Sequence, residues 1–423
     1  MPESAQPNLR ARVIGGGPAG LMAAEVLANL GADVAVFDHM PSMGRKLLLA
    51  GRSGLNLTHS EGIEDLLDRY GPARSRLEAA VHSFGPDALR AWSESLGEDT
   101  YIGTSGRVFP DSWRATPLLR AWLVRLVGLG VRLEPRHRWS GWADTAPSAS
   151  SSQTLRFFRA NGTVHEEEAD ITVLALGGAS WPRVGSDGGW VTILRGVGVR
   201  VQDLQPSNVG VETGWSPHFV GRFEGTPLKN IAITRGGRTV RGDAMVTVSG
   251  LEGLPVYSHS SAVRDEVARN GRSLLAVDLH PDLAVDEVAR RLGRRRPKDS
   301  LSNWLRRSLG LSPVAIGLLR ECCGNELPGT PEALARLVKH AEIVVVGTTG
   351  IERAISSAGG VTLDEVDDRF MLRRLPGTFV AGEMLDWEAP TGGYLLQATF
   401  STAVAAARGA LQWAKISGGG APE

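Results

Sequence analysis

Six residues near the N-terminus have the types and spacing of a phosphate-binding loop. Gly15, Gly17 and Gly20 occupy the first, third and sixth positions of the segment GGGPAG. In such a loop the first glycine permits a tight turn, the second lets the backbone approach a pyrophosphate, and the third lets a helix pack closely. Asp38 follows 18 residues after Gly20, where an acidic side chain can accept hydrogen bonds from ribose hydroxyls. The pattern predicts a dinucleotide site.

The elements around the loop are those that this chemistry requires. A short apolar strand runs into the glycines, an amphipathic helix follows, and a second apolar strand over residues 33–37 ends on Asp38. The helix N-terminus offers free N–H groups and partial positive charge to phosphates. A glycine-rich turn without a ligand does not need this ordered series. We therefore expect the following residues to contact the cofactor: Gly15, Gly17, Pro18, Ala19, Gly20, Asp38 and His39.

Two later segments favour a flavin over a nicotinamide as the bound cofactor. A buried strand over residues 170–176 ends on Gly177, as strands that return to a dinucleotide site do. Further on, Gly382-Glu383 ends a strand where flavoproteins commonly hold the ribityl chain. The pair Gly392-Gly393 then begins a helix, whose N–H groups could stabilise negative charge on a reduced ring if no Cβ pushed the ring away. Because FAD is long, it needs such a distant second segment, so we expect FAD.

Composition and charge agree with an enzyme of two or three domains. The chain has 423 residues, zero formal net charge and two cysteines, Cys322 and Cys323. The neutral charge gives no nucleic-acid footprint, and no apolar run approaches the ~20 residues that span a bilayer. The start lacks an apolar secretory segment, and two adjacent cysteines build no disulfide framework, which favours the cytoplasm. We expect a small organic molecule as partner, with no nucleic acid, membrane or metal; the oligomeric state stays open.

The order of the segments predicts an α/β protein whose cofactor domain is divided. Flavin signatures lie on both sides of residues 195–340 and none lies between. We expect the FAD-binding domain to combine residues 11–190 with residues 341–413. The inserted part is expected to be β-rich and on the substrate side over residues 195–280, and helical over residues 281–340. Buried strands are expected at residues 344–347 and 379–382.

Five segments together resemble a known family. They are GGGPAGLMAAEVLA, GRKLLLAGRSGLNLTHS, LALGGASWPRVGSDG, TTGIERAISSAGGVTLDEVD and FVAGEMLDWEAPTGGYLLQ. Over residues 11–412 the chain is similar to the BaiN/RdsA-type NAD(P)/FAD-dependent oxidoreductases. The resemblance implies a discontinuous Rossmann-type FAD domain, an inserted β-barrel-like domain and a small helical domain. It also implies bound FAD, and relatives that reduce C=C bonds in steroid-like substrates.

The resemblance assigns cofactor contacts to further residues. These are Arg45, Lys46 and Leu47 near the phosphates and ring, Asn56 in the loop that follows, and Gly382, Glu383, Gly393, Tyr394 and Leu395 near the ribityl chain and isoalloxazine. One position departs from the pattern. Many relatives have a cysteine in the loop that here reads GRSGLNLT, so a thiol role is absent and the substrate of a relative does not follow directly.

The group that exchanges a proton with the substrate is less evident. Flavin supplies the electron chemistry, and a side chain must protonate or deprotonate a carbon. His59 follows the flavin loop and is the candidate catalytic residue; a surface or capping histidine is the alternative. Arg52 and Arg183 could hold an anionic substrate, or be solvated or pyrophosphate-neutralising arginines, and Tyr101 and His259 are weaker candidates.

The sequence therefore favours an FAD-dependent oxidoreductase that transfers a hydride between NAD(P)H, flavin and an organic substrate, by C=C reduction or dehydrogenation. An O2-using flavin oxidase or hydroxylase is an alternative within enzymes. A flavin-binding protein without turnover is an alternative of another class. No second nucleotide fingerprint distinguishes NADH from NADPH.

Overall fold

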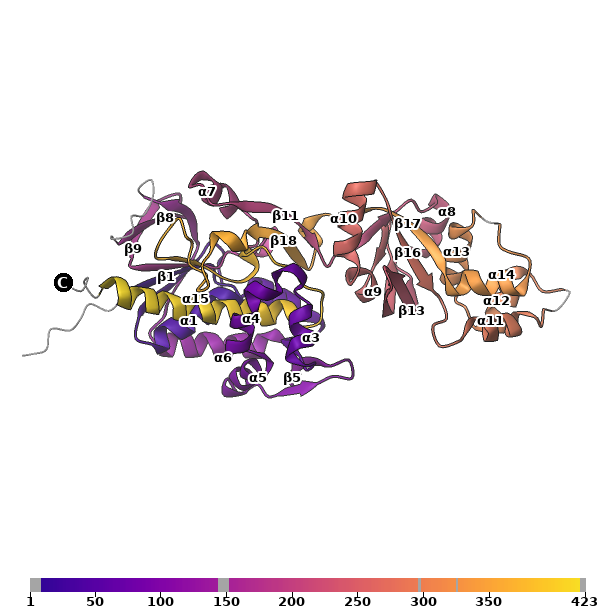
Figure 1. The fold of residues 1–423 in the computed structure, drawn as a ribbon, viewed down its shortest axis with the longest axis horizontal. Coiled ribbons are helices and arrows are strands. Elements are labelled where there is room, and N and C mark those ends of the chain that lie inside the picture. The colour runs from indigo at the N-terminus through magenta and orange to yellow at the C-terminus, as the bar shows by residue number, and fades with distance from the viewer. Residues whose placement is uncertain (1–8, 144–151, 296–297, 325, 419–423) are drawn as a thin grey trace, which may run out of the picture. The chain divides into compact units, whose positions relative to one another are not determined.

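A parallel sheet carries the glycine loop. In a computed structural model, which describes residues 9–143, 152–295, 298–324 and 326–418, its strands lie in the order β19-β10-β1-β2-β6. Their bounds are Thr378–Val380, Ile171–Leu174, Arg10–Ile14, Asp33–Asp38 and Arg132–Pro135. All four neighbouring pairs are parallel. Because β19 lies in the C-terminal part of the chain, the sheet joins segments far apart in sequence. Figure 1 likewise shows the C-terminal helix α15 (Tyr394–Gly418) beside the N-terminal helix α1 (Pro18–Asn29).

The sheet is covered by helices whose packing includes one buried carboxylate. Helices α1 and α15 pack against each other. Glu25 of α1 is buried and accepts the indole N–H groups of Trp92 and Trp122 at 3.0 and 2.6 Å. The guanidinium of Arg125 forms an ion pair with the other oxygen of the Glu25 carboxylate, at 3.1 Å. A buried charge is stable only when it is paired in this way, so Glu25 holds α1 against α5 (Pro86–Ser95) and α6 (Ala115–Gly128).

Smaller elements surround this core. The described residues form two three-stranded antiparallel sheets. They are β3-β5-β4 (Thr58–His59, Arg107–Pro110, Thr100–Ile102) and β7-β8-β9 (His137–Trp142, Gln153–Arg159, Val164–Ala169). The remaining helical pieces are α2 (Arg45–Ala50), η1 (Gly51–Ser53), α3 (Ile63–Asp68), η2 (Gly71–Ala73), α4 (Arg74–Ser83), η3 (Pro182–Val184), α7 (Trp190–Gly196), η5 (Leu363–Glu365) and η6 (Gly382–Met384).

A closed six-stranded barrel forms a second core. Its strands, in the order β12-β15-β14-β13-β16-β17, are Val211–Thr213, Gly250–Glu252, Arg238–Val246, Pro227–Arg235, Ser273–Asp278 and Ala341–Thr348. The accompanying helices are α8 (Pro217–Phe223), α9 (Leu254–Tyr257), α10 (Ser260–Asn270), α11 (Val285–Leu292), α12 (Leu301–Leu309), α13 (Pro313–Cys322), α14 (Pro331–Lys339) and η4 (Ile351–Arg353). Their apolar side chains form one cluster with the barrel interior, separate from the cluster around the parallel sheet.

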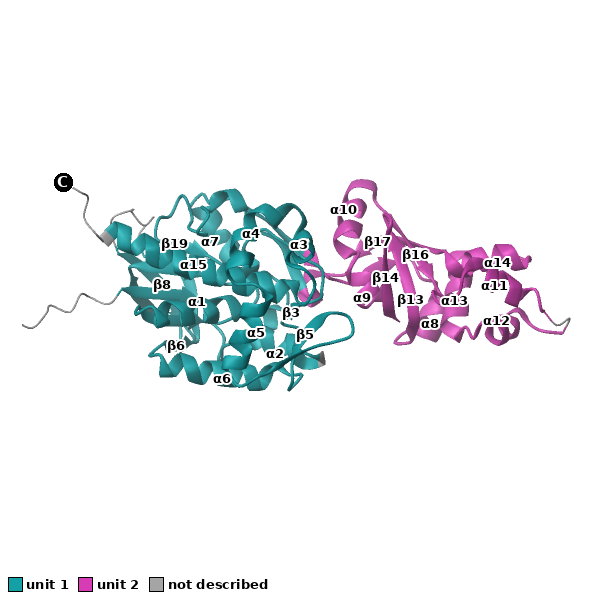
Figure 2. Cartoon of the chain, turned by 60° about the horizontal axis from the view of Figure 1, so that its bottom comes forward, with its two compact units in different colours: residues 1–205, 356–423 teal, residues 206–355 magenta. Residues whose placement is uncertain are grey.

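The chain divides into two units, coloured separately in Figure 2. We name Met1–Gln205 with Ser356–Glu423 the dinucleotide unit, and Pro206–Ile355 the barrel unit. The boundaries differ from those expected at 190–195 and 340–341. Strand β17 closes the barrel by pairing with β12 and β16, and β11 (Val201–Ser207) and β18 (Ser356–Val361) form a two-stranded sheet where the chain passes between units.

The fold class expected from the sequence is confirmed. The protein is α/β, with a Rossmann-type parallel sheet in two chain segments and an inserted barrel. The expected β-rich and helical parts share one core, so they form one unit. The expectation of a buried strand at 344–347 is wrong, because Val344 and Val346 are 47% and 52% exposed. A barrel strand buries only alternate side chains, here Ile343 and Val345.

Candidate functional site

The loop between β1 and α1 has the geometry that its spacing predicts. Gly15 has a φ of 110°, and a Cβ there would lie 2.2 Å from the carbonyl oxygen of Ala175. A Cβ on Gly20 would lie 1.8 Å from the carbonyl oxygen of Gly15, whereas a Cβ on Gly17 meets no atom within 4 Å. Packing therefore requires Gly15 and Gly20. Gly17 faces open space, where a ligand can approach the backbone.

Asp38 lies against this loop at the end of β2. Its Oδ2 accepts the N–H of Gly16 at 2.7 Å, and its Oδ1 accepts the N–H of Met40 at 2.7 Å. Each carboxylate oxygen has a second lone pair, so Asp38 can still accept ribose hydroxyls. The ring nitrogens of His39 lie 3.9 Å from the carboxylates of Asp38 and Asp187. Burial of the ring is the main cause that lowers the pKa of His39, and the positive charge of Arg138 lowers it further.

Helix α2 connects the loop to the distant C-terminal segment. The N–H of Gly44, before α2, donates to the carbonyl oxygen of Gly16 at 2.8 Å. Lys46 Nζ then donates to the Glu383 carboxylate at 2.6 Å and to the Ser180 hydroxyl at 2.7 Å. Two residues that the sequence assigned to the same cofactor, Lys46 and Glu383, are therefore in direct contact.

Glu383 is the meeting point of several segments. Its carboxylate also accepts the N–H of Ser357 at 2.9 Å and, at the longer distance of 3.4 Å, that of Gly178. The preceding Gly382 has a φ of 74°, and a Cβ there would lie 2.7 Å from the Cβ of Ala19 in α1. The structure thus brings the phosphate-binding loop, the end of β10 and the end of β19 together.

Three serines at this place were not anticipated from the sequence. Ser180 bonds Lys46, Ser357 bonds Glu383, and the Oγ of Ser186 lies 3.4 Å from the Cβ position of Gly177. In the sequence these serines are recognisable only as small polar residues near glycines, and ordinary turns contain the same residues. Contacts between distant segments were needed to find them.

Several buried polar atoms in these segments have no partner within the part of the chain that the structure describes. They are Arg45 Nε, Asn56 Oδ1, Ser186 Oγ and Thr391 Oγ1. Buried polar groups in proteins are nearly always hydrogen-bonded, so these atoms indicate bonds that a ligand or water completes. Together with the open space at Gly17, they fit an extended polar ligand such as a dinucleotide.

The structure gives a different reason for glycine before α15 from the one expected. A helix does begin after the pair, at Tyr394. Gly393 has a φ of 99°, and a Cβ there would lie 2.4 Å from the carbonyl oxygen of Thr58 in β3. Gly393 lacks a side chain because β3 leaves no room for one, so our expectation that a Cβ would displace the ring is corrected.

The two leucines assigned to the cofactor belong to the hydrophobic core. Leu47 of α2 is 2% exposed, and Leu395 packs partly buried against the same core. Their side chains hold α2 and the first turn of α15 in place.

His59 lies on β3 with both ring nitrogens engaged. Its Nε2 is 3.0 Å from the carbonyl oxygen of Ser105, and its Nδ1 accepts the N–H of Glu61 at 3.2 Å. The ring also stacks on Tyr394, with centroids 5.3 Å apart. This network assigns the proton to Nε2 and leaves neither nitrogen free to exchange a proton with a substrate.

Tyr394 is the polar residue at the start of α15. Arg69 donates to both oxygens of Glu61, at 3.0 and 2.6 Å, and lies 5.7 Å from the Tyr394 ring centroid. Burial, with a further contribution from the Glu61 carboxylate, raises the pKa of the Tyr394 hydroxyl. At neutral pH this hydroxyl keeps its proton and acts as a hydrogen-bond donor.

Four candidates from the sequence remain: Arg52, Arg183, Tyr101 and His259. Arg52 and Arg183 are exposed, and neither has an ion pair among the described residues. Tyr101 lies exposed on β4. His259 belongs to the barrel unit, where it is buried and its Nε2 is 3.1 Å from the carbonyl oxygen of Ile233. Among the described residues, Arg52, Arg183 and Tyr101 make no hydrogen bond to the network of Lys46 and Glu383.

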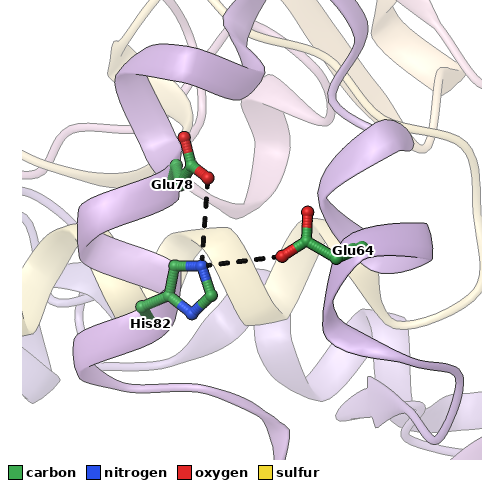
Figure 3. A group of neighbouring side chains, drawn as sticks. All are labelled: Glu64, Glu78 and His82. Atoms are coloured by element: carbon green, nitrogen blue, oxygen red, sulfur yellow. Dashed lines mark ion pairs between the residues drawn. The ribbon is translucent and has the colours of Figure 1, made fainter.

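An acidic cluster outside the site joins α3 and α4 (Figure 3). The Nε2 of His82 lies 3.9 Å from Glu64 and 4.0 Å from Glu78, and these three groups could face one cation. Arg74 already pairs with Glu64, and both Glu64 and His82 are exposed. We assign no metal to it.

Across the described residues, no helix has the length and apolarity to cross a membrane.

Comparison with known proteins identifies the family. A model of the HI0933-like protein Rossmann domain matches residues 9–409. The chain is 26% identical over 419 residues to the 3-dehydro-bile acid delta(4,6)-reductase of Clostridium scindens, covering 95% of this chain and 99% of that protein. It is 24% identical over 402 residues to the ribosomal RNA dihydrouridine synthase of Haemophilus influenzae, covering 93% and 96%.

A solved structure has the same fold. The 3-ketosteroid delta1-dehydrogenase of Sterolibacterium denitrificans, in complex with 1,4-androstadiene-3,17-dione, matches with a TM-score of 0.52 and 12% identity, covering 97% of this chain and all of that one. The family model spans nearly the whole chain, and the loop, the divided sheet and the inserted barrel are all in place. The chain therefore belongs to the HI0933-like Rossmann-domain family of flavoprotein oxidoreductases, as its motifs indicated.

Proposed function

We propose that the protein binds FAD and transfers a hydride from NAD(P)H to a C=C bond of a small organic substrate. The observation that carries the proposal is the contact of Lys46 with Glu383 beside a loop whose Gly17 faces open space. This arrangement supports one long cofactor held by both ends of the chain. The name of the Clostridium scindens relative, a bile acid reductase, supports C=C reduction.

FAD, when bound, supplies the hydride chemistry, and the protein supplies binding and orientation. Pro18 has no N–H, so the free donors at the start of α1 come from Ala19 and Gly20, which lie where a pyrophosphate is expected. Asp38 would accept ribose hydroxyls through the remaining lone pairs of its carboxylate. Asn56 and Thr391 offer unpaired buried oxygens that can accept hydrogen bonds from the rest of the cofactor.

We further propose that His59 is a positioning residue. Its bonds to Ser105 and Glu61 and its stacking on Tyr394 connect β3 to the first turn of α15. Through these contacts it fixes the helix start without exchanging a proton itself. The expected readout of His59→Ala is weaker FAD binding with an unchanged pH profile of the residual activity.

Anaerobic stopped-flow mixing of the purified yellow protein with NADH or NADPH tests the electron donor. We expect rapid loss of the flavin absorbance with at least one nicotinamide, and slow reoxidation by air in the absence of substrate. Fast reoxidation coupled to substrate consumption would identify an oxidase or hydroxylase instead. Flavin that no donor reduces would leave a flavin-binding protein without turnover.

A further inference from the structure

Three aromatic side chains, two of them exposed, form a cluster on the β4–β5 hairpin and the turn that follows it. Phe109 of β5 lies with its ring centroid 4.5 Å from Trp113 and 5.9 Å from Tyr101 of β4, and all three planes are within 29° of one another. Tyr101 and Trp113 are 39% and 43% exposed, whereas Phe109 is 9% exposed. Exposed aromatic rings grouped in this way mark a binding surface more often than scattered ones do. The outer rings can stack against a planar ligand.

Trp113 is held toward this surface by its own backbone and by the expected flavin loop. Its φ of 63° lies in the left-handed region, which a bulky residue rarely adopts. The N–H of Leu55 donates to its carbonyl oxygen at 3.0 Å, and a Cβ on Gly54 would lie 2.5 Å from its ring. The loop that contains Asn56 therefore leaves room for the indole and fixes its position.

Three arginines belong to the segments that carry or adjoin the aromatic cluster. Arg107 pairs with His59 across β3 and β5 and shares a strand face with Phe109, two residues further on. Arg114 follows Trp113, and Arg52 lies in η1, whose Gly51 packs against Ala115 at the start of α6. In the described part of the chain none of Arg52, Arg107 and Arg114 has an ion pair or a side-chain hydrogen bond.

The local charge is modest rather than strongly basic. Two exposed carboxylates, Asp99 and Asp111, adjoin the end of the hairpin where Thr100 pairs with Pro110. The chain as a whole has zero net charge. Binding of RNA requires cations that follow a phosphate backbone, whereas a small anion needs only one or two guanidinium groups.

We propose that the aromatic cluster and its arginines bind the anionic end of a small ring-bearing substrate. The ring stacks on Trp113 or Tyr101, and the anionic group pairs with Arg107 and Arg114. The substrate's reducible end then extends along β3 toward the start of α15. The proposal rests on the proposed function, because it concerns the substrate of the same site.

Equilibrium dialysis of the FAD-loaded protein with 1-pyrenebutyrate, a fused planar ring with a carboxylate, tests this surface. The neutral 1-pyrenebutanol is measured in parallel. We expect Tyr101→Thr and Trp113→Asn to weaken pyrenebutyrate binding about fivefold to tenfold; asparagine tolerates the left-handed backbone of position 113. The double variant Arg107→Gln/Arg114→Gln should remove the preference for the carboxylate over the alcohol.

Matched controls are Phe158→Thr, an exposed aromatic residue on β8, and Arg120→Gln, an exposed arginine on α6; both should bind like the parent protein. Equal binding of the alcohol and the carboxylate to the parent, or equal losses in the controls, would overturn the proposal. So would tight, steeply salt-dependent binding of an oligouridylate without binding of pyrenebutyrate, which would indicate an RNA surface. Failure of NAD(P)H to reduce the flavin would overturn the proposed function and leave this binding result intact.

Discussion

At the scale of single residues, the glycines of the phosphate-binding loop differ in why glycine is needed: two for packing within the protein, and one for the approach of a ligand. A side chain on Gly15 or Gly20 would strike backbone atoms, whereas a side chain on Gly17 would strike nothing in the protein. Only the substitution at Gly17 therefore tests the ligand without disturbing the fold.

We predict that Gly17→Val folds but does not retain FAD. The valine side chain would occupy the space through which the pyrophosphate approaches the backbone. The measurement is flavin content after purification, together with the thermal midpoint of the apoprotein. Gly128→Val in α6 is the control, because a Cβ there also meets no atom within 4 Å. Normal flavin content in Gly17→Val would contradict the placement of the pyrophosphate.

A second residue-scale prediction concerns the ion pair between Lys46 and Glu383. Both side chains are mostly buried, at 25% and 17% exposure, so solvent screens the pair only in part. In a double-mutant cycle of Lys46→Met and Glu383→Gln, we expect a coupling energy of about 1 kcal/mol in urea unfolding. Additive effects would show that the pair does not join the two chain segments.

Residue roles that follow from local geometry could be predicted from the sequence, and roles that follow from distant contacts could not. The turn glycines and Asp38 are defined by spacing within one βαβ unit. The engagement of both His59 nitrogens depends on Ser105 and Glu61, which no local pattern connects to position 59. The spacing places Gly393 just before a helix, but its packing against Thr58 arises from a strand 335 residues earlier.

At the scale of elements, the junction between β3 and α15 determines how the C-terminal helix approaches the site. Gln397 is fully buried. Its Oε1 accepts the hydroxyl of Thr58 at 2.6 Å, and its Nε2 donates to the carbonyl oxygen of Phe84 at 2.8 Å. The Gln397 amide is thus hydrogen-bonded both to β3 and to the segment after α4.

We predict that Gln397→Leu destabilises the fold by about 1–3 kcal/mol, because it leaves the buried hydroxyl of Thr58 without a partner. The carbonyl oxygen of Phe84 keeps its hydrogen bond from the Ser401 hydroxyl. Urea unfolding of the apoprotein measures the change. The double variant Gln397→Leu/Thr58→Val should regain part of the loss, since it removes one stranded hydroxyl. Gln202→Leu, at an exposed position on β11, is the control. A single variant as stable as the parent would show that the junction contributes little.

The strand that closes the barrel, β17, could not be recognised as a barrel strand from the sequence pattern. Residues 344–346 are all valine, so no alternation of polar and apolar residues marks the strand, and the run has the pattern of a fully buried strand. Pairing with β12 and β16 places β17 in the barrel instead.

At the scale of the whole molecule, the two units have separate hydrophobic cores. We predict that residues 206–355 fold alone, with a cooperative thermal transition and no bound flavin. Circular dichroism of the expressed segment measures this. The two-part dinucleotide unit, joined directly from residue 205 to residue 356, should retain FAD. An unfolded segment would show that the barrel depends on the rest of the chain.

A partly buried histidine in the dinucleotide unit and a buried histidine in the barrel unit predict that the fold loses stability in acid. Burial lowers the pKa of His39 in the dinucleotide unit and of His259 in the barrel unit. Below the unfolded value of about 6.5, the unfolded chain binds protons that the folded chain excludes, so stability is lost as pH falls from that value toward the folded pKa. Urea unfolding at successive pH values should show this loss, and His259→Gln should reduce it.

The insertion of the barrel unit between two halves of the parallel sheet also affects the order of biosynthesis. A ribosome completes β1, α1 and β10 first, then the whole barrel, and only afterwards β19 and α15. Domains generally fold as units during synthesis, from the N-terminus. The barrel can therefore form on the ribosome while the nascent dinucleotide unit still lacks the edge strand β19 and the helix that packs on α1. If both ends of the chain hold the cofactor, as we propose, cofactor capture is one of the last events in making this protein, and we expect chains that terminate early to leave the ribosome without flavin.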